Sequence, residues 1–333
     1  MLYAAFTLFP PCLVNAAEGE LVISCLFPTD IGSITPPVRR TISSFSTYST
    51  LSPLPQSSSP AILKASGSFE FRNFRPLRAV VVVGSATIIH SWAYHQFNNI
   101  WWNHPQTHFH LYRGWKQNQG LYDFGFHDSL WLHMDKFGHF YCARQLAFLM
   151  TETFNWIGLS NGCSSWLGAA SSWLFMLEIE LFDARFQEWG FSLGDLTANT
   201  AGVLLPVLKA HSPFLQKFTL KMSYHPTKQG IKNDYFIDDY AGMTFWLCAN
   251  PRPLLPRFLR NWWPAFLNLS AGYGISEKTD GKIELYFGLD YDLLKLKTKQ
   301  PALNKLIEFI NYFHLPAPAL RIQPSLLFQP FNF

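Results

Sequence analysis

The sequence predicts an α+β protein: a small, membrane-associated bundle of about four helices, followed by an antiparallel β-sheet. Apolar segments of helical length fall within residues 69–212, and apolar and polar residues alternate repeatedly within residues 213–333. Charged residues make up only 14% of the 333 residues and aromatic residues make up 17%, whereas an ordinary soluble domain has about 25% charged residues. This composition favours contact with lipid and excludes a disordered chain, a coiled coil and a highly charged nucleic-acid-binding protein.

The N-terminal segment resembles an export signal. Residues 1–17 are apolar and end in small residues, and Val22-Ile23-Ser24-Cys25 resembles a lipoprotein box. Residues 1–27 are therefore predicted to be an export or lipoprotein signal, which would place the protein in the cell envelope, on the periplasmic side. Residues 28–68 are rich in Ser, Pro and Thr, so we expect a disordered linker there.

Four helices are predicted in the middle of the chain. The first, at 77–94, is long and apolar enough to be a marginal transmembrane helix; a buried core helix is the alternative, because His90 and Ser91 interrupt the run. The others are predicted at 134–156, 164–182 and 193–208. In the third helix, small residues recur every four positions and form a face that a second helix can approach closely: Ser164, Gly168 and Ser172.

Polar residues gather near the ends of the last three predicted helices. If these helices run up, down and up, as short connections favour, one end of the bundle brings all of the polar groups together. Residues four apart share one face of a helix, as Asp135 and His139 do. The complete set is Asp135, Lys136, His139, Glu180, Asp183, Asp195 and Asn199.

Three roles are open for these residues. Carboxylates and an imidazole can hold a divalent metal, the only cofactor that the sequence suggests; the candidate ligands are Asp135, His139, Asp183 and Asp195. The same groups can act as general acid and base, for which the candidates are Asp135, His139, Glu180, Asp183 and Asp195. Lys136 and Asn199 are candidates for binding a ligand or a lipid headgroup. The third role is a hydrogen-bond network that fixes helix packing.

The last third of the chain reads as β structure. Apolar and polar residues alternate at 218–224, 243–247, 267–273 and 283–293, which predicts a sheet of about four to six strands with one apolar face. Residues 301–314 are predicted to form a short amphipathic helix.

Basic residues follow the helical region and are either a solvated surface or a face for anionic headgroups. They are Lys209, Lys217, Lys221, Lys228, Lys232, Arg252, Arg257 and Arg260. We expect a membrane lipid or an envelope component as the partner and no nucleic acid, while the sequence predicts no particular protein partner.

Several motifs resemble one envelope family. They are Asp135-Lys136-Phe137-Gly138-His139, then Ile179-Glu180-Leu181-Phe182-Asp183, then the segment 189–202 that contains Asp195 and Asn199, with further likeness to about residue 325. The family is the domain of unknown function 2279, described as predicted periplasmic lipoproteins. The Asp-Lys-x-x-His start is more distantly similar to VanZ-type membrane proteins. The resemblance implies that the seven polar residues are the family's characteristic positions, and it implies no particular activity.

One departure from the family's pattern concerns the end of the third helix. The family tends to have Asp-Gly-Phe-Ser where this chain has Asp183-Ala184-Arg185-Phe186. We therefore expect the loss of a glycine with positive φ and the gain of a cation beside the polar cluster. This favours an envelope protein whose cluster binds a ligand or headgroup, or fixes helix packing. The alternative is a membrane-edge hydrolase that acts on a lipid-linked or cell-wall substrate.

Overall fold

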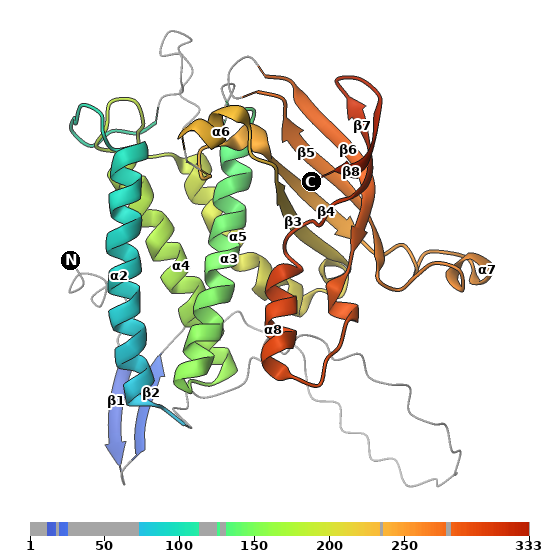
Figure 1. The fold of residues 1–333 in the computed structure, drawn as a ribbon. Coiled ribbons are helices and arrows are strands. Elements are labelled where there is room, and N and C mark those ends of the chain that lie inside the picture. The colour runs from blue at the N-terminus through green and yellow to red at the C-terminus, as the bar shows by residue number, and fades with distance from the viewer. Residues whose placement is uncertain are drawn as a thin grey trace, which may run out of the picture.

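The computed structural model describes residues 12–17, 20–25, 73–112, 125–126, 131–233, 236–277 and 281–332. Helices come first and a six-stranded antiparallel sheet follows, which confirms the predicted α+β class (Figure 1). Four long helices stand beside the sheet: α2 (Pro76–Ile100), α3 (Met134–Ile157), α4 (Asn161–Asp183) and α5 (Leu193–His211). Each overlaps a helix predicted from the sequence.

Helix α2 lies at the outer side of the bundle (Figure 1). Among the described helices it is the one that is long and apolar enough to cross a membrane, and none of its apolar window is buried inside the protein. Leu77, Ile88 and Trp92 are exposed, and Ala93 is its buried residue. The alternative of a buried core helix is therefore wrong for this segment.

Helices α3 and α4 pack closely because of the small residues on α4. Ser164 and Ser172 are fully buried, and the Ser172 hydroxyl donates a hydrogen bond of 2.6 Å to the carbonyl of Ala143 on α3. A Cβ atom at Gly168 would lie 2.7 Å from the backbone nitrogen of Thr151. The spacing of four residues thus marks the contact between the two helices.

The sheet contains six strands in chain order, each antiparallel to the next. They are β3 (Phe218–Tyr224), β4 (Met243–Ala249), β5 (Leu267–Ile275), β6 (Ile283–Tyr291), β7 (Ala317–Gln323) and β8 (Leu327–Asn332). The short helices are α6 (Lys228–Asn233) and α7 (Arg257–Arg260) within the β3–β4 and β4–β5 connections, and α8 (Pro301–Ile310) between β6 and β7. After α8 the chain runs alongside the first strand, where the backbone of Met222 bonds to those of Tyr312 and His314.

The two faces of the sheet differ from the simple predicted pattern. The apolar face packs against α3, where Met222, Met243 and Phe245 contact Met134 and Tyr141. The opposite face carries polar side chains that are buried. Lys221 and Asp290 are examples, at 1% and 0% exposed. The interpretation of Lys221 as part of a solvated or headgroup-facing basic surface is therefore wrong, because Lys221 pairs with Asp290 inside the protein.

At the N-terminus, β1 (Cys12–Ala17) and β2 (Glu20–Cys25) pair as antiparallel strands. The export signal at 1–27 stays a prediction. The predicted linker at 28–68 lies outside the described residues.

Candidate functional site

The start of α3, the end of α4 and the start of α5 meet at one end of the bundle. The Lys136 ammonium lies 2.5 Å from Asp135 Oδ2 and 2.9 Å from Asp195 Oδ1. His139 Nδ1 lies 3.4 Å from Glu180 Oε1 and 3.2 Å from Asn199 Oδ1. These residues, with Asp183, are called the bundle cluster below. The cluster contains all seven polar residues that the sequence singled out.

Ser192 links the start of α5 to the end of α4. Its hydroxyl caps α5 by accepting the Asp195 N–H at 3.1 Å, and its own N–H donates to Glu180 Oε2 at 3.3 Å. Sequence reasoning missed Ser192, although Ser192-x-x-Asp195 is a recognisable capping pattern. The neighbouring Gly194 permits a close approach, since a Cβ there would collide with the carbonyl of Gly125 and lie 3.0 Å from Lys136 Cε.

Asp183 accepts a hydrogen bond from a residue that lies outside α3, α4 and α5. The Trp102 indole N–H donates a hydrogen bond of 2.6 Å to Asp183 Oδ1, and the Trp102 ring stacks on Phe182 with centroids 4.7 Å apart. Trp102 follows α2 and is buried. We find no local sequence signal that distinguishes this tryptophan from the eleven others in the chain.

Carboxyl groups outnumber cationic groups in the bundle cluster, which holds four carboxyl groups, one ammonium and one imidazole. Burial raises the pKa of Asp183 to about 7, against the hydrogen bond from Trp102. Burial and the charges of Asp195 and Asp183 raise the pKa of Glu180 well above its usual value. Burial would lower the pKa of Lys136, but the charges of Asp195 and Asp135 outweigh it and hold that pKa above its ordinary value.

A cavity of about 450 Å³ opens beside the bundle cluster. Asp135, His139, Asp183 and Asp195 lie on its wall. The rest of the wall is mostly apolar and comes from the helices and the sheet, including Phe97, Trp101, Leu149, Met176, Met243 and Phe245. The cavity is therefore amphipathic, and its volume falls within the range of about 300–1,000 Å³ typical of small-molecule sites.

A divalent ion is chemically compatible with part of the bundle cluster. His139, Glu180 and Asp195 can each offer a ligand atom, and these atoms lie within 4.8 Å of one another. Asp135 and Asp183, two of the four predicted metal ligands, do not belong to this trio. Lys136 already neutralises Asp195, so an ion here would compete with an ammonium group.

The end of α4 does not have the geometry expected from the departure at Ala184. Ala184 caps the helix with φ −56°, so this position needs no glycine with positive φ. The Arg185 side chain is exposed, and no ion pair joins it to the carboxylates in the described part of the chain. The added cation therefore does not pair with the bundle cluster among the described residues.

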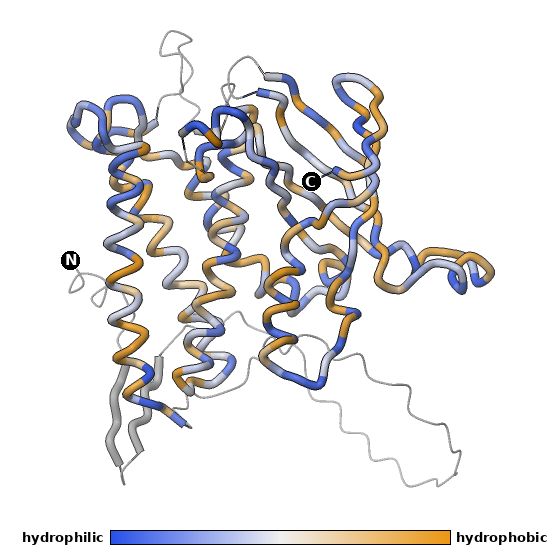
Figure 2. Tube along the Cα trace, viewed as in Figure 1, coloured by the Kyte–Doolittle hydropathy of each residue, from blue (hydrophilic) through white to orange (hydrophobic). Residues whose placement is uncertain are grey.

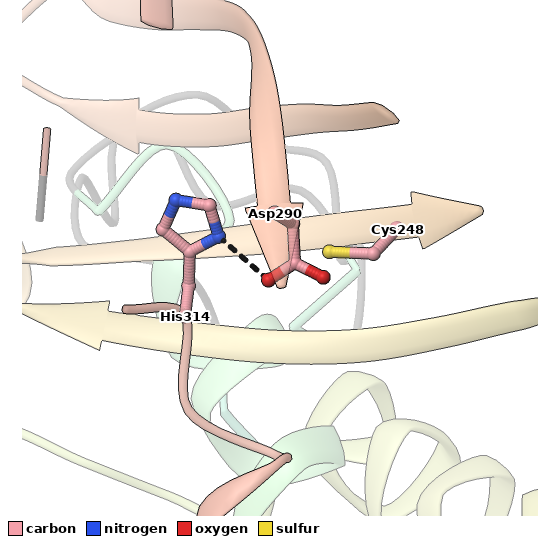
Figure 3. Close-up of side chains that lie close together, drawn as sticks. All are labelled: Cys248, Asp290 and His314. Atoms are coloured by element: carbon pink, nitrogen blue, oxygen red, sulfur yellow. Dashed lines mark hydrogen bonds and ion pairs between the residues drawn. The ribbon is translucent and has the colours of Figure 1, made fainter. Parts of the chain in front are cut away.

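A second buried cluster, which sequence reasoning missed, lies in the sheet. Figure 3 shows the Cys248 and His314 side chains directed at the carboxylate of Asp290. His314 Nδ1 lies 3.2 Å from Asp290 Oδ1, the Lys221 ammonium lies 2.9 Å from the same oxygen, and Asn268 Nδ2 donates to Oδ2 at 3.0 Å. These five residues, Lys221, Cys248, Asn268, Asp290 and His314, are called the sheet cluster. Strand alternation could have placed Lys221 and Asp290 on one face, but no local pattern brings His314 to them.

Asp290 is the centre of the sheet cluster. Burial alone would raise its pKa, but the bonds from His314 and Lys221 outweigh it and hold that pKa below the usual range. Burial and the charge of Asp290 raise the pKa of the Cys248 thiol. Cys248, Asp290 and His314 are close enough to hold a metal. However, the Lys221 ammonium occupies the carboxylate and the thiol keeps its proton, so we interpret this cluster as a structural ion pair.

Comparison with known proteins gives a family match in the region around the bundle cluster. Residues 124–211 match the family model of the predicted periplasmic lipoprotein DUF2279. The resemblance to this family is thus confirmed over a segment that contains the whole bundle cluster, although the motifs suggested a match over about residues 90–325. The more distant likeness to VanZ-type proteins is not supported. No curated protein and no solved structure gives a significant match to this chain.

The DUF2279 match supports the coarser conclusion about location and function. The family's description as a predicted periplasmic lipoprotein is consistent with an uncharacterised protein of the cell envelope. It assigns no ligand and no reaction to the bundle cluster.

Proposed function

We propose that this envelope protein binds an amphipathic molecule. Its apolar part occupies the cavity between the bundle and the sheet, and its polar head contacts the bundle cluster. The observation that carries the proposal is the composition of the wall of that cavity of about 450 Å³, where Asp135, His139, Asp183 and Asp195 interrupt a mostly apolar lining.

The charge of the bundle cluster selects the type of head. Four carboxyl groups face one ammonium group, so an anionic phosphate or carboxylate head would meet an excess of acceptor oxygens and few hydrogen-bond donors. An amine or a hydroxyl-rich head would donate hydrogen bonds to these oxygens and neutralise or share their charge. The preferred ligand is therefore an amphiphile with an amine or several hydroxyl groups.

The state of the cluster favours ligand binding over a purely structural network. Asn199 Nδ2 is buried and has no hydrogen-bond partner among the described residues. The raised pKa values of Glu180 and Asp183 mean that the fold disfavours their charged forms. In the sheet cluster two buried atoms also have no partner in the described part of the chain, Asn268 Oδ1 and His314 Nε2, but its carboxyl group is held in the charged form, so the raised pKa values are what distinguish the bundle cluster. The hydrolase alternative gains no support from the comparisons.

Membrane association is a further part of the proposal. The exposed apolar surface of α2 is long enough to span a bilayer. A membrane lipid or another envelope component is then the available source of an amphipathic ligand. On this interpretation the protein works at a membrane on the periplasmic side of the envelope.

A pair of fluorescent probes tests the proposal. The full chain is titrated with a dansyl-labelled long-chain amine and with the dansyl-labelled fatty acid of equal chain length. We expect the amine to bind about tenfold more tightly, a difference of about 1.4 kcal/mol. E180Q/D183N should remove this preference, because a bound ammonium group favours ionisation of these two carboxyl groups and amides cannot ionise.

A matched pair of leucine substitutions tests the cavity itself. Leu149 lines the cavity, whereas Leu181 is similarly exposed on α4 and does not. L149W should weaken the binding of both probes about tenfold, and L181W should leave it unchanged. The proposal would be contradicted if neither probe binds. It would also be contradicted if both probes bind equally and L149W leaves their binding unchanged.

A further inference from the structure

The connection between β4 and β5, residues 250–266, projects away from the rest of the protein and includes α7 (Figure 1). We infer that this segment, called the β4–β5 arm, docks on an anionic lipid bilayer. The arm lies at the opposite side of the molecule from α2 (Figure 1). This inference concerns a surface separate from the ligand cavity and does not depend on the proposed function.

The arm exposes large apolar side chains. Trp262 is 86% exposed, Leu254 is 84% exposed and Phe258 is 68% exposed, and Leu259 and Phe266 are exposed as well. Isolated exposed apolar residues are ordinary, but five within seventeen residues of one projecting segment form a patch. Burying such side chains in the interface of a bilayer is favourable by about 25 cal/mol for each Å² of apolar surface.

Positive charge is interleaved with these apolar side chains. Arg252, Arg257 and Arg260 are exposed, and the arm contains no acidic residue. Figure 2 shows the alternation of hydrophobic and hydrophilic residues along it. Arginine near an anionic membrane surface contributes about 1 kcal/mol, and tryptophan prefers the headgroup region. The complementary partner is therefore a surface that is negatively charged outside and apolar beneath, as an anionic bilayer is.

The arm is ordered before it meets a partner. The Arg260 guanidinium donates to the carbonyls of Pro253 and Leu255, at 3.4 and 3.2 Å. Asn250 Nδ2 donates to the carbonyls of Ala265 and Leu267, at 2.8 and 3.2 Å. The arm also contains four prolines, which restrict the unbound chain. Docking therefore loses little conformational entropy, which favours binding.

Vesicle co-sedimentation of the full chain tests the inference. The vesicles contain phosphatidylcholine alone, or phosphatidylcholine with phosphatidylglycerol. We expect the native protein to prefer the anionic vesicles. R252Q/R257Q/R260Q should weaken binding to them about 100-fold, since each arginine contributes about fivefold. The matched control K295Q/K297Q/K299Q removes the same charge from another segment and should change binding less than about twofold.

A second variant distinguishes loss of charge from local unfolding of the arm. Arg257 makes no hydrogen bond or ion pair to the described residues, so R257E should leave the arm folded and weaken anionic binding about 20-fold. Insertion is measured by quenching of Trp262 with brominated phosphatidylcholine, as the difference between the native protein and W262F.

Three results would overturn the inference. They are equal binding of the native protein to both kinds of vesicle, a loss of binding in K295Q/K297Q/K299Q equal to that in R252Q/R257Q/R260Q, or no quenching that depends on Trp262. Failure of the amine probe to bind the cavity would leave this result unaffected, because the two experiments report on different surfaces.

Discussion

The sheet cluster and the bundle cluster are both buried groups of ionisable residues, but their balance of donors and acceptors is opposite. In the sheet, Lys221, Asn268 and His314 converge on the single carboxylate of Asp290. In the bundle, the carboxyl groups of Asp135, Glu180, Asp183 and Asp195 share one ammonium and one imidazole. The same side-chain chemistry thus occurs once with an excess of donors and once with an excess of acceptors.

The directions of the pKa shifts follow from this difference. The pKa of Asp290 is lowered despite its burial, because its partners stabilise the charged form. The pKa of Asp183 is raised to about 7 and that of Glu180 is raised as well, because burial is not compensated there. A compensated cluster is typical of a structural role, whereas an uncompensated one beside a cavity is typical of a binding site.

The largest expected effect concerns the sheet cluster. D290A leaves the Lys221 ammonium buried without its partner, so we expect the free energy of unfolding to fall by about 3–5 kcal/mol in urea denaturation. E152A is the control, because Glu152 forms a surface ion pair with Lys305, whose side chain is 55% exposed. It should cost about 1 kcal/mol or less. Equal losses in the two variants would remove the structural interpretation of the sheet cluster.

The next largest effect concerns the close contact between α3 and α4. G168A places a Cβ against the backbone of α3 and should cost about 1–3 kcal/mol in the same assay. G84A is its control, since Gly84 lies in the interior of α2 with nothing near its missing Cβ. It should stabilise the protein by about 0.5–1 kcal/mol. Equal effects would mean that α3 and α4 do not depend on close contact.

The fold was largely predictable because its periodic patterns are strong. Four helices and the first four strands of the sheet lie where apolar periodicity predicts them. Strands β7 and β8 were not identified individually, since Pro318 and Pro330 lie within them and strand patterns with proline are weak predictors. The buried polar face of the sheet was also missed, because alternation alone does not reveal whether a polar face meets water or other polar side chains.

The candidate site was only partly predictable. Helical spacing and the family motifs located all seven residues of the bundle cluster. Trp102 was missed because its bond to Asp183 joins residues 81 positions apart, and the His314–Asp290 contact is likewise set by tertiary packing. The cavity was missed for a similar reason, since its wall combines helix and sheet residues that no local pattern connects.

The last expected effect is the dependence of stability on pH. Because the folded pKa of Asp183 lies above its unfolded value, the folded state holds its proton more tightly between about pH 4 and about pH 7. The stability that this proton contributes is therefore lost as the pH rises through that window. The raised pKa of Glu180 acts in the same direction.

The free energy of unfolding of the native protein and E180Q/D183N, measured by urea denaturation at about pH 5 and about pH 8, tests the central claim most directly. Both amides keep an oxygen to accept the hydrogen bonds from Ser192 and Trp102. We predict that the stability of the variant relative to the native protein rises by about 2 kcal/mol from the lower to the higher pH, with partial exposure of Asp183 reducing the full value of about 1.4 kcal/mol per pKa unit. A relative stability that stays constant or falls between the two pH values would contradict the account, because the two carboxylates would then be structural.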